Sequence, residues 1–394
     1  MVSHHRRSKI HGVSRSFAMA KHLTKRGHRI TLLTTADSKK LGIDCRFTDG
    51  VEIIDIPDLL WGSLRSGWDP WSGLNRLLFL LKRGSTFDLV HLFESRPATT
   101  HPLQFYKYWR QTPLIIDWVD WIGRGGLLEI RRPKWYKALF GGMETFYEEF
   151  YRAKADGGTV ICSALKDRAE RLGMRPDSIL KIPNGVDFEY FQDTLEKGSC
   201  RDTLGFPVGE KILTFAAMDA DFDFQILLDA MLVIVRRYPK ARLMITGRVN
   251  PRIQRWVHQN SFSGHLLFTG FVAPKEFPIY LGSSDLFLLP ISDTIYNRGR
   301  WPSKVTDYMA AGRPIVANPV GDVRELFSNH RIGLLANYDH NDLADKVLAL
   351  LDNEDLAQEL GHNARQVALE HYNWANLIVD LEDLYFRIIG SDRV

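Results

Sequence analysis

The 394-residue sequence has only three cysteines, Cys45, Cys162 and Cys200, and they lie far apart. Such cysteines provide neither a disulfide framework nor the paired ligands of a structural zinc site, so they favour a reducing compartment. The sequence has no apolar run near the ~20 residues that a membrane-spanning helix needs. Its basic N-terminus is not followed by the apolar segment of a secretory signal. We therefore expect a cytoplasmic globular protein.

The chain has little net charge, formally +4 at pH 7, but its charges are unevenly distributed. Basic residues are in excess over residues 1–190, and acidic residues are in excess over residues 191–394. A basic first half can attract an anionic acceptor or a lipid surface. The sequence has no recognition-helix, zinc-finger or RNA-binding motif, so we expect no nucleic-acid partner.

A segment rich in basic and aromatic residues lies between Arg131 and Lys154. Such a composition can seat a helix in a membrane interface, which predicts peripheral contact with the inner face of a membrane. The acids Glu144, Glu148 and Glu149 lie in the same segment and favour instead a helix packed on its own sheet. The sequence alone leaves both interpretations open.

The N-terminal region lacks the apolar strand with which a doubly wound domain begins. The first helical pattern spans Ser14–Arg26, and the residues before it are mostly polar. We therefore expect residues 1–12 to form a loop and the first strand to be missing, through truncation or because the domain has one strand fewer. His4, His5 and His11 lie in this segment without supporting ligands, so we predict no metal site and no cofactor.

Elsewhere helical and strand-like patterns alternate, which predicts an α/β fold built from parallel sheets. The length favours two domains. A turn signal at Pro183–Asp187 precedes a polar connection, so we place the domains at residues 1–188 and 189–372, followed by a helix in residues 373–394 that packs back on the first. The predicted strands are Arg29–Thr35, Asp88–Phe93, Leu114–Ile116, Thr159–Cys162, Ile179–Ile182, Lys211–Phe215, Arg242–Thr246, Leu266–Phe268, Asp285–Leu289, Ile315–Ala317 and Gly333–Leu335.

The segment from Trp301 to Ala317 predicts a helix, a tight turn and a buried strand. Pro302 suits the first turn of a helix, Gly312 suits its end, and Pro314 prevents its continuation. A helix N-terminus presents unpaired N–H groups and a partial positive charge, so the start of this helix is a candidate anion site.

Three cations, Arg298, Arg300 and Lys304, surround the start of this helix in the sequence. Together with the helix N-terminus they predict a binding site for a pyrophosphate. Asp307 lies one turn further along, where its carboxylate can accept hydrogen bonds from the hydroxyls of a ribose. The alternative is an ordinary helix of an α/β domain with solvated arginines.

Two acids, Asp117 and Asp120, follow the third predicted strand. Ligands of parallel sheets bind at the carboxyl ends of the strands, so these carboxylates can take a proton from an acceptor or orient a sugar. Arg124 can bind an anionic acceptor, and Trp118 and Trp121 can stack on a sugar ring. The alternative is a buried aspartate that caps loops, with the tryptophans in the core.

Six short segments match the motifs of one enzyme family in their order and spacing. They are Ala155–Ser163, Ile182–Asp187, Phe268–Val272, Ser284–Pro290, Met309–Val316 and Val320–Glu325. These segments extend over more than half of the chain, which through them resembles the retaining GT-B glycosyltransferases of the "glycosyl transferases group 1" or glycosyltransferase family 4 type. The resemblance implies two Rossmann-like, doubly wound domains that face each other across a cleft.

By this resemblance the protein transfers a sugar, with retention, from a nucleotide diphosphate sugar to a hydroxyl of a glycan or lipid-linked acceptor in cell-envelope synthesis. The second domain holds the donor, and no metal is required. The matched motifs imply a set of substrate-binding residues, namely Gly270, Val272, Gly312, Pro314, Gly321 and Asp322.

The sequence departs from the family pattern at the donor site. The family carries a Glu-x7-Glu pair, of which the second member, expected to hold the ribose, falls on Asp307 and the first on Gly299. The family's phosphate-binding Arg and Lys fall on Ala217 and Phe222.

Arg300, Lys304 and Arg248 can supply the missing positive charge around the departing diphosphate, an electrostatic effect that is usually the largest in such chemistry. Asp117 and Asp120 then face the acceptor. The departures leave two alternatives open, a nucleotide-sugar-binding relative without transferase activity and a nucleotide-sugar epimerase.

Overall fold

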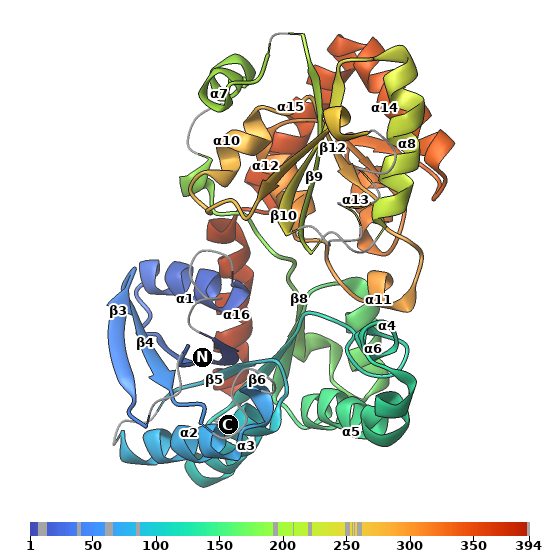
Figure 1. The fold of residues 1–394 in the computed structure, drawn as a ribbon. Helices are drawn as coiled ribbons and strands as arrows, with labels where there is room; N and C mark the ends of the chain where they lie inside the picture. The colour runs from blue at the N-terminus through green and yellow to red at the C-terminus, as the bar shows by residue number, and fades with distance from the viewer. Residues whose placement is uncertain are drawn as a thin grey trace. The chain divides into compact units, whose positions relative to one another are not determined.

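The computed structural model describes residues 1–6, 14–37, 41–59, 66–83, 87–191, 196–207, 209–219, 223–248, 253, 255, 257 and 262–391, with only the main chain at 217–219, 248 and 391. The chain forms two compact units (Figure 1). Unit 1 comprises Met1–Asn184, Arg298–Trp301 and Trp374–Val394, and unit 2 comprises Gly185–Asn297 and Pro302–Asn373. Each unit has its own sheet and its own core.

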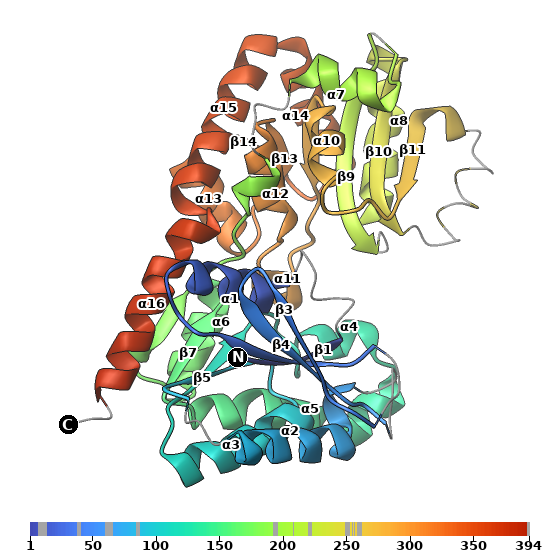
Figure 2. The ribbon, with the colours of Figure 1, turned by 90° about the vertical axis from the view of Figure 1, so that its left-hand side faces the viewer.

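Unit 1 is built on an eight-stranded sheet in the order β3-β4-β2-β1-β5-β6-β7-β8. The described strands pair in parallel except for β3 and β4. Helices α1 and α16 cover one face, and α2 and α3 cover the other, as in a doubly wound domain (Figure 2). The elements are β1 (Val2–Arg6), α1 (Arg15–Lys25), β2 (Thr31–Thr35), β3 (Asp44–Thr48), β4 (Val51–Ile56), α2 (Pro70–Lys82), β5 (Val90–Phe93), α3 (Pro97–Arg110), β6 (Leu114–Trp118), α4 (Leu127–Arg131), α5 (Lys134–Ala153), β7 (Gly157–Val160), α6 (Ser163–Arg171), β8 (Ile179–Lys181) and α16 (Trp374–Ser391).

The first strand of unit 1 is present, so the prediction that it is missing is wrong. Strand β1 lies at the centre of the sheet, between β2 and β5, within residues predicted to be a loop. Its main chain makes the ladder hydrogen bonds, which do not depend on apolar side chains. Ser3 is fully buried, and the Arg76 guanidinium donates to the Ser3 carbonyl at 3.2 Å. A five-residue strand with polar buried side chains leaves no apolar pattern to detect.

The hairpin of β3 and β4 is also absent from the sequence prediction. Thr48 pairs with Val51, and the residues between them, Asp49 and Gly50, have φ of 50° and 77°. Asp-Gly with positive φ at both positions is the signature of a type I′ hairpin turn. The Asp-Gly pair is therefore a sequence signal from which this hairpin can be recognised.

The C-terminal helix α16 packs on unit 1. Its Leu381 and Ile388 share a buried apolar cluster with Met19 of α1. Gly157 in β7 has little room for a side chain, because a β-carbon there would lie 3.0 Å from Cδ1 of Ile388 and 3.0 Å from the carbonyl oxygen of Ser178. Glycine at this position thus suits the close approach of α16 to the sheet.

Unit 2 is built on a six-stranded parallel sheet in the order β11-β10-β9-β12-β13-β14 (Figure 2). Its core forms mainly between the sheet and helices α8 and α14. The elements are α7 (Lys197–Leu204), β9 (Lys211–Asp219), α8 (Phe224–Arg237), β10 (Ala241–Arg248), β11 (Leu266–Gly270), α10 (Phe277–Gly282), β12 (Leu286–Leu289), α11 (Ile295–Arg298), α12 (Lys304–Ala311), β13 (Ile315–Ala317), α13 (Asp322–Asn329), β14 (Gly333–Leu335), α14 (His340–Asp352) and α15 (Glu354–His371).

The two sheets confirm the predicted α/β class with doubly wound domains. Every predicted strand has a counterpart, although β7 begins two residues earlier than expected, at Gly157. Helix α12 ends as predicted, before Gly312, whose φ is 70°. Among the described residues, no helix combines the length and apolarity needed to cross a membrane.

Candidate functional site

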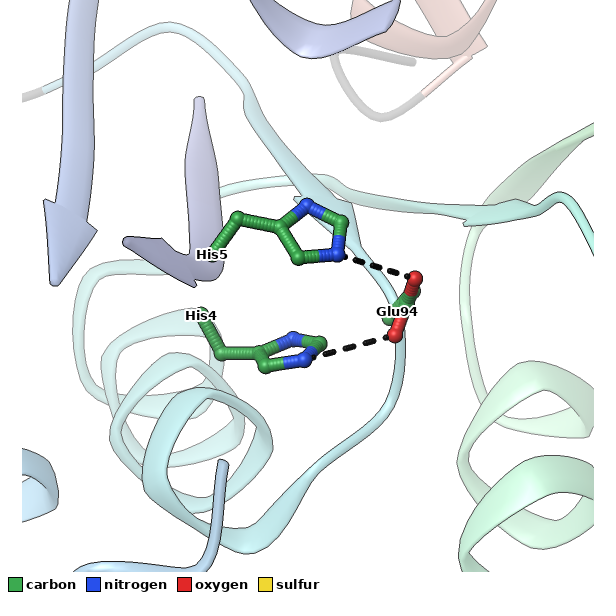
Figure 3. A group of neighbouring side chains, drawn as sticks. All are labelled: His4, His5 and Glu94. Atoms are coloured by element: carbon green, nitrogen blue, oxygen red, sulfur yellow. Dashed lines mark ion pairs between the residues drawn. The ribbon is translucent and has the colours of Figure 1, made fainter. Parts of the chain in front are cut away.

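The order of the strands in the unit 1 sheet reverses direction at β1, because β2 lies on one side of it and β5 on the other. This position is the topological switch point of the sheet. In open parallel sheets, ligands bind outside the carboxyl ends of the strands at such a point. The carboxyl ends of β1, β5 and β6 carry His4, His5, Glu94 and Asp120. Figure 3 shows one imidazole directed at each oxygen of the Glu94 carboxylate. The structure thus places four titratable groups where a substrate site is expected.

Asp120 is the acid of this site whose pKa suits proton transfer. Burial, and secondly the charge of Glu94, raise its pKa to about 7, although Arg300 and Arg131 oppose the shift. The main chains of Asp120 and Arg300 form an isolated antiparallel bridge, so Arg300 lies with unit 1. A carboxyl group with a pKa near neutrality can act as an acid or a base at physiological pH.

Asp117, the other predicted acid, is not placed for such a role. Its side chain is 1% exposed, and its carboxylate accepts hydrogen bonds from Arg15 and from the Thr159 hydroxyl. The Arg15 guanidinium also donates to the carbonyls of Ile182 and Pro183, at 2.7 and 2.9 Å. The geometry therefore supports the interpretation of a buried aspartate and not that of an acid facing an acceptor.

Trp118 likewise belongs to the core and not to a sugar-stacking surface. Its ring is 1% exposed, and the guanidinium carbons of Arg152 and Arg168 lie 4.6 and 4.9 Å from the ring. Its Nε1 donates to the Glu148 carboxylate at 3.0 Å. A tryptophan enclosed in this way has no face left for a sugar ring, which corrects the prediction.

The loop after Asp120 is held in place from α5. The Glu148 carboxylate accepts from the main-chain N–H of Ile122 at 2.7 Å. A β-carbon at Gly126 would lie 1.9 Å from the carbonyl oxygen of Trp121, so this position requires glycine. Trp121 is half-buried and Arg124 is exposed. The loop therefore has a fixed path and presents Arg124 to solvent.

The carboxyl edge of the unit 2 sheet carries most of the predicted donor-site residues. Gly270 ends β11 with a φ of 67°, and Gly321, with a φ of 56°, precedes α13. Val272 and Asp322 adjoin them. Arg248 ends β10, but its side chain lies outside the described part of the chain. The structure thus brings these loops to one edge of the sheet.

The first turn of α12 carries Lys304 and Asp307. Nζ of Lys304 lies 3.9 Å from the Asp307 carboxylate and 4.8 Å from the centre of the Phe277 ring. Burial raises the pKa of Asp307, and the charge of Lys304 opposes this shift. Because α12 connects β12 to β13, which are parallel, its N-terminus lies at the carboxyl edge of the sheet. A cation and a helix N-terminus at this edge form a suitable anion site.

Gly312 and Pro314, which were also predicted to bind substrate, lie at the other end of α12. The helix has 8 residues, which is a length of about 12 Å. A β-carbon at Gly312 would contact the Arg365 side chain at 3.6 Å. The Pro314 carbonyl accepts from the N–H of Phe287 at 2.9 Å, at the amino edge of the sheet. Both residues end the helix and begin the next strand.

The structure divides the predicted cation cluster, since Arg298 and Arg300 belong to unit 1 and Lys304 belongs to unit 2. It also adds Glu94, which the sequence analysis missed. Glu94 directly follows β5, much as Asp120 follows β6, so the strand-end argument could have found it. His11 and Phe222, and the side chain of Ala217, lie outside the described residues.

Comparisons with known proteins match the chain to two family models. The model described as "Glycosyltransferase Family 4" matches residues 11–190, within unit 1 for almost its whole length. The model described as "Glycosyl transferases group 1" matches residues 209–353, in the half of the chain that carries unit 2. Together they span most of the chain.

Among curated proteins, the chain is similar to alpha-monoglucosyldiacylglycerol synthase of Streptococcus pneumoniae, with 24% identity over 92% of this chain and 80% of that protein. Among solved structures it is similar to sucrose-phosphate synthase from Thermosynechococcus elongatus, with a TM-score of 0.76, 16% identity and coverage of 95% and 93% of the two chains. It is also similar to Anabaena Alr3699/HepE in complex with UDP and glucose, with a TM-score of 0.66, 15% identity and coverage of 93% of each chain. At these identities the structural matches establish the fold alone.

Proposed function

The chain belongs to the GT-B glycosyltransferases of the group 1 and family 4 type, and we propose that it transfers a sugar, with retention, from a nucleotide diphosphate sugar to a hydroxyl of a lipid-linked or glycan acceptor. The name of the streptococcal relative supports a glycolipid product. The Anabaena structure, which holds UDP and glucose, supports a uridine diphosphate sugar as donor. We place the reaction in the synthesis of a cell-envelope glycolipid or glycan.

One observation carries the donor assignment, namely the position of Lys304 and Asp307 in the first turn of α12. The Lys304 ammonium group and the helix N-terminus suit a diphosphate, which gains negative charge as the sugar departs. The half-buried Asp307 suits the hydroxyls of a ribose. Gly270, Val272, Gly321 and the acid after it would border the nucleotide from the neighbouring loops of unit 2.

The acceptor assignment rests on unit 1. A carboxyl group with a pKa near 7 suits proton removal from a hydroxyl, and we assign this role to Asp120. Arg300 is fixed beside Asp120 by the main-chain bridge, and exposed Arg124 lies on the following loop. Asp117 is a positioning residue, because its ion pair with Arg15 fixes the end of β6.

We infer peripheral membrane contact of unit 1, and the way α5 distributes its side chains supports it. Two of its three acids point inward, since Glu144 and Glu148 are 5% and 2% exposed and pair with Arg96 and Arg168. Its large apolar residues point outward at helical spacing, and they are Trp135, Leu139, Phe146 and Phe150. The exposed basic residues Arg131, Arg132 and Lys134 adjoin this apolar stripe. An apolar stripe next to cations is complementary to an anionic lipid surface.

The test is a transfer assay with purified protein, a panel of nucleotide diphosphate sugars, and vesicles that contain diacylglycerol or a glycosylated diacylglycerol as acceptor. We expect a glycosylated lipid whose new linkage has the anomeric configuration of the donor. A product with inverted configuration would refute retention, and turnover only with soluble glycans would refute the lipid acceptor.

A second candidate function is nucleotide-sugar binding without transfer. Gly299, at the position where the family carries a glutamate, favours it. The same assay distinguishes a transferase from a binding protein, because a binding protein would show saturable donor binding with neither transfer nor hydrolysis. Conversion of the donor sugar in the absence of any acceptor would indicate an epimerase.

A further inference from the structure

Two adjacent histidines and a glutamate from another strand converge at the carboxyl edge of the unit 1 sheet. Nε2 of His4 lies 3.5 Å from Oε2 of Glu94, and Nε2 of His5 lies 3.4 Å from Oε1 (Figure 3). One ligand atom from each residue lies within 4.8 Å of the other two. Three donor atoms of this kind, from two separate strands, form a compact and preformed cluster.

We propose that His4, His5 and Glu94 bind a divalent transition-metal ion such as Zn²⁺. Metal bonds of about 2.1 Å in tetrahedral geometry place neighbouring ligand atoms about 3.4 Å apart. Each imidazole lies at about this distance from one oxygen of the carboxylate, His4 from Oε2 and His5 from Oε1. One ligand atom of each residue lies within 4.8 Å of the other two, so a small rotation of the side chains brings the three ligands around one ion. Imidazole nitrogens suit zinc, iron, nickel and copper better than calcium or magnesium, and two histidines with one carboxylate leave a coordination position open.

The charges at the cluster suit a cation. Imidazole binds metals in its neutral form, and the His4 side chain is 13% exposed, so burial disfavours its charged form. The Glu94 carboxylate, which faces both imidazoles, supplies the negative charge that attracts a cation. The charge of Arg96, the cation next along the chain, reaches the cluster, but it is partly compensated because Arg96 pairs with Glu144.

The backbone at Glu94 is in an unusual conformation. Its φ of 66° is in the left-handed region, which is uncommon for residues other than glycine and costs free energy. The cluster also lies at the switch point of the sheet, where ligands of such sheets bind. This position places the cluster near Asp120, and the charge of Glu94 acts on the Asp120 carboxyl group.

The proposal goes beyond the proposed function, because metal binding can be measured without donor or acceptor. The protein, without a polyhistidine tag and freed of metal with a chelator, is titrated with Zn²⁺ by calorimetry and with Co²⁺ by visible absorption. We expect one equivalent of each metal to bind. The Co²⁺ complex should show the absorption bands of a four- or five-coordinate ion.

Two variants and a control locate the site. Glu94→Gln keeps the shape of the side chain, and His5→Ala removes the more exposed imidazole. Each should weaken Zn²⁺ binding at least ~10-fold, since even indirect metal partners contribute that much. His101→Ala, which removes an exposed histidine on α3, should bind as the wild type does. Circular dichroism of each variant verifies that it is folded.

The absence of saturable Zn²⁺ binding by the wild type would overturn the proposal. Equal affinities of the wild type, Glu94→Gln and His5→Ala would do so as well, because the ion would then be bound elsewhere. A loss of binding in His101→Ala would also count against the site. None of these results depends on whether the protein transfers a sugar.

Discussion

The carboxylate of Asp117 lies 3.1 and 3.2 Å from Nε of Arg15, and both side chains are buried. The pair joins α1 to β6, and the hydrogen bond from Arg15 to the Ile182 carbonyl extends the connection to the end of β8. Buried ion pairs add little to stability over apolar pairs, but the loss of one partner leaves a buried charge uncompensated. The pair therefore fixes the relative positions of α1 and β6, the strand that Asp120 follows.

Removal of Arg15 should destabilise the protein strongly. We expect Arg15→Met to lower the free energy of unfolding by about 3–5 kcal/mol, because Asp117 then stays buried without its partner. Urea denaturation followed by circular dichroism measures the change. The exposed pair of Arg237 and Asp352 is the control, and Arg237→Met should have a much smaller effect, because solvent screens exposed ion pairs. A similar cost for both variants would show that the Arg15 pair is not buried as described.

The rate of transfer should depend on the ionisation of Asp120. A base must lose its proton before it can act, so kcat/KM of the metal-free protein should rise with pH through about 7, the pKa of Asp120. Assays between pH 5.5 and about 8.5 with a chelator present measure the profile. Asp120→Asn should lose the rise and most of the activity, whereas Asp167→Asn, a change at an exposed residue of α6, should keep both. A flat wild-type profile would contradict the assignment.

The contact between α16 and α1 should weaken in acid. Glu382 accepts hydrogen bonds from Arg26 and from His28, and these lower the pKa of Glu382 from 4.5 to about 2. A carboxylate with a lowered pKa stabilises the fold above its unfolded pKa, and this stabilisation is lost as pH falls toward the folded pKa. The difference in unfolding free energy between the wild type and Glu382→Gln should therefore shrink as pH falls from about 5 toward 2.

Urea titrations at a series of pH values measure this difference. Asp383→Asn, a change at the exposed neighbour of Glu382, is the control and should leave the pH dependence as it is in the wild type. If Glu382→Gln differed from the wild type by the same amount at every pH, the ion pairs would not be the cause.

The outer face of α5 should bind anionic vesicles. Trp135 and Leu139 are 62% and 71% exposed. Burial of one such side chain in a lipid surface contributes about 1.5–3 kcal/mol to the free energy of binding. Trp135→Ala should therefore reduce binding to vesicles with phosphatidylglycerol about tenfold or more in a sedimentation assay. Phe386→Ala, which removes an aromatic ring exposed to a similar degree on α16, should bind like the wild type. Equal losses in both variants would exclude a specific role of α5.

The elements that the sequence predicts well are those whose buried side chains are apolar. The strand at Ile315–Ala317 and the end of α12 at Gly312 agree with the structure. Strand β1 could not be predicted in this way because His4 and Ser3 occupy it and its stability comes from main-chain pairing on both sides. The hairpin turn at Asp49 was detectable, since Asp-Gly favours this turn.

Some features of the candidate site could likewise be predicted from the sequence, and others could not. Position along the chain correctly suggested that Asp120 follows a strand and that Lys304 begins a helix, and both lie at the carboxyl edge of a sheet. Burial was not readable from the sequence, because Asp117 and Asp120 have the same side chain, yet Asp117 is buried in β6 and paired with Arg15, whereas Asp120 lies beyond the strand and is only partly buried. Proximity across strands was not readable either, and it is what joins Glu94 to the histidines of β1.

The most direct test of the proposed function is the affinity for uridine diphosphate of the wild type, Lys304→Ala and Lys275→Ala, measured by calorimetry. Lys275 is an exposed lysine of unit 2 and serves as the control. If the diphosphate binds at the first turn of α12, Lys304→Ala should weaken binding about tenfold or more, since a charge-assisted hydrogen bond contributes about 1.5–3 kcal/mol, and Lys275→Ala should not weaken it. Equal affinities of all three proteins would contradict the placement of the donor.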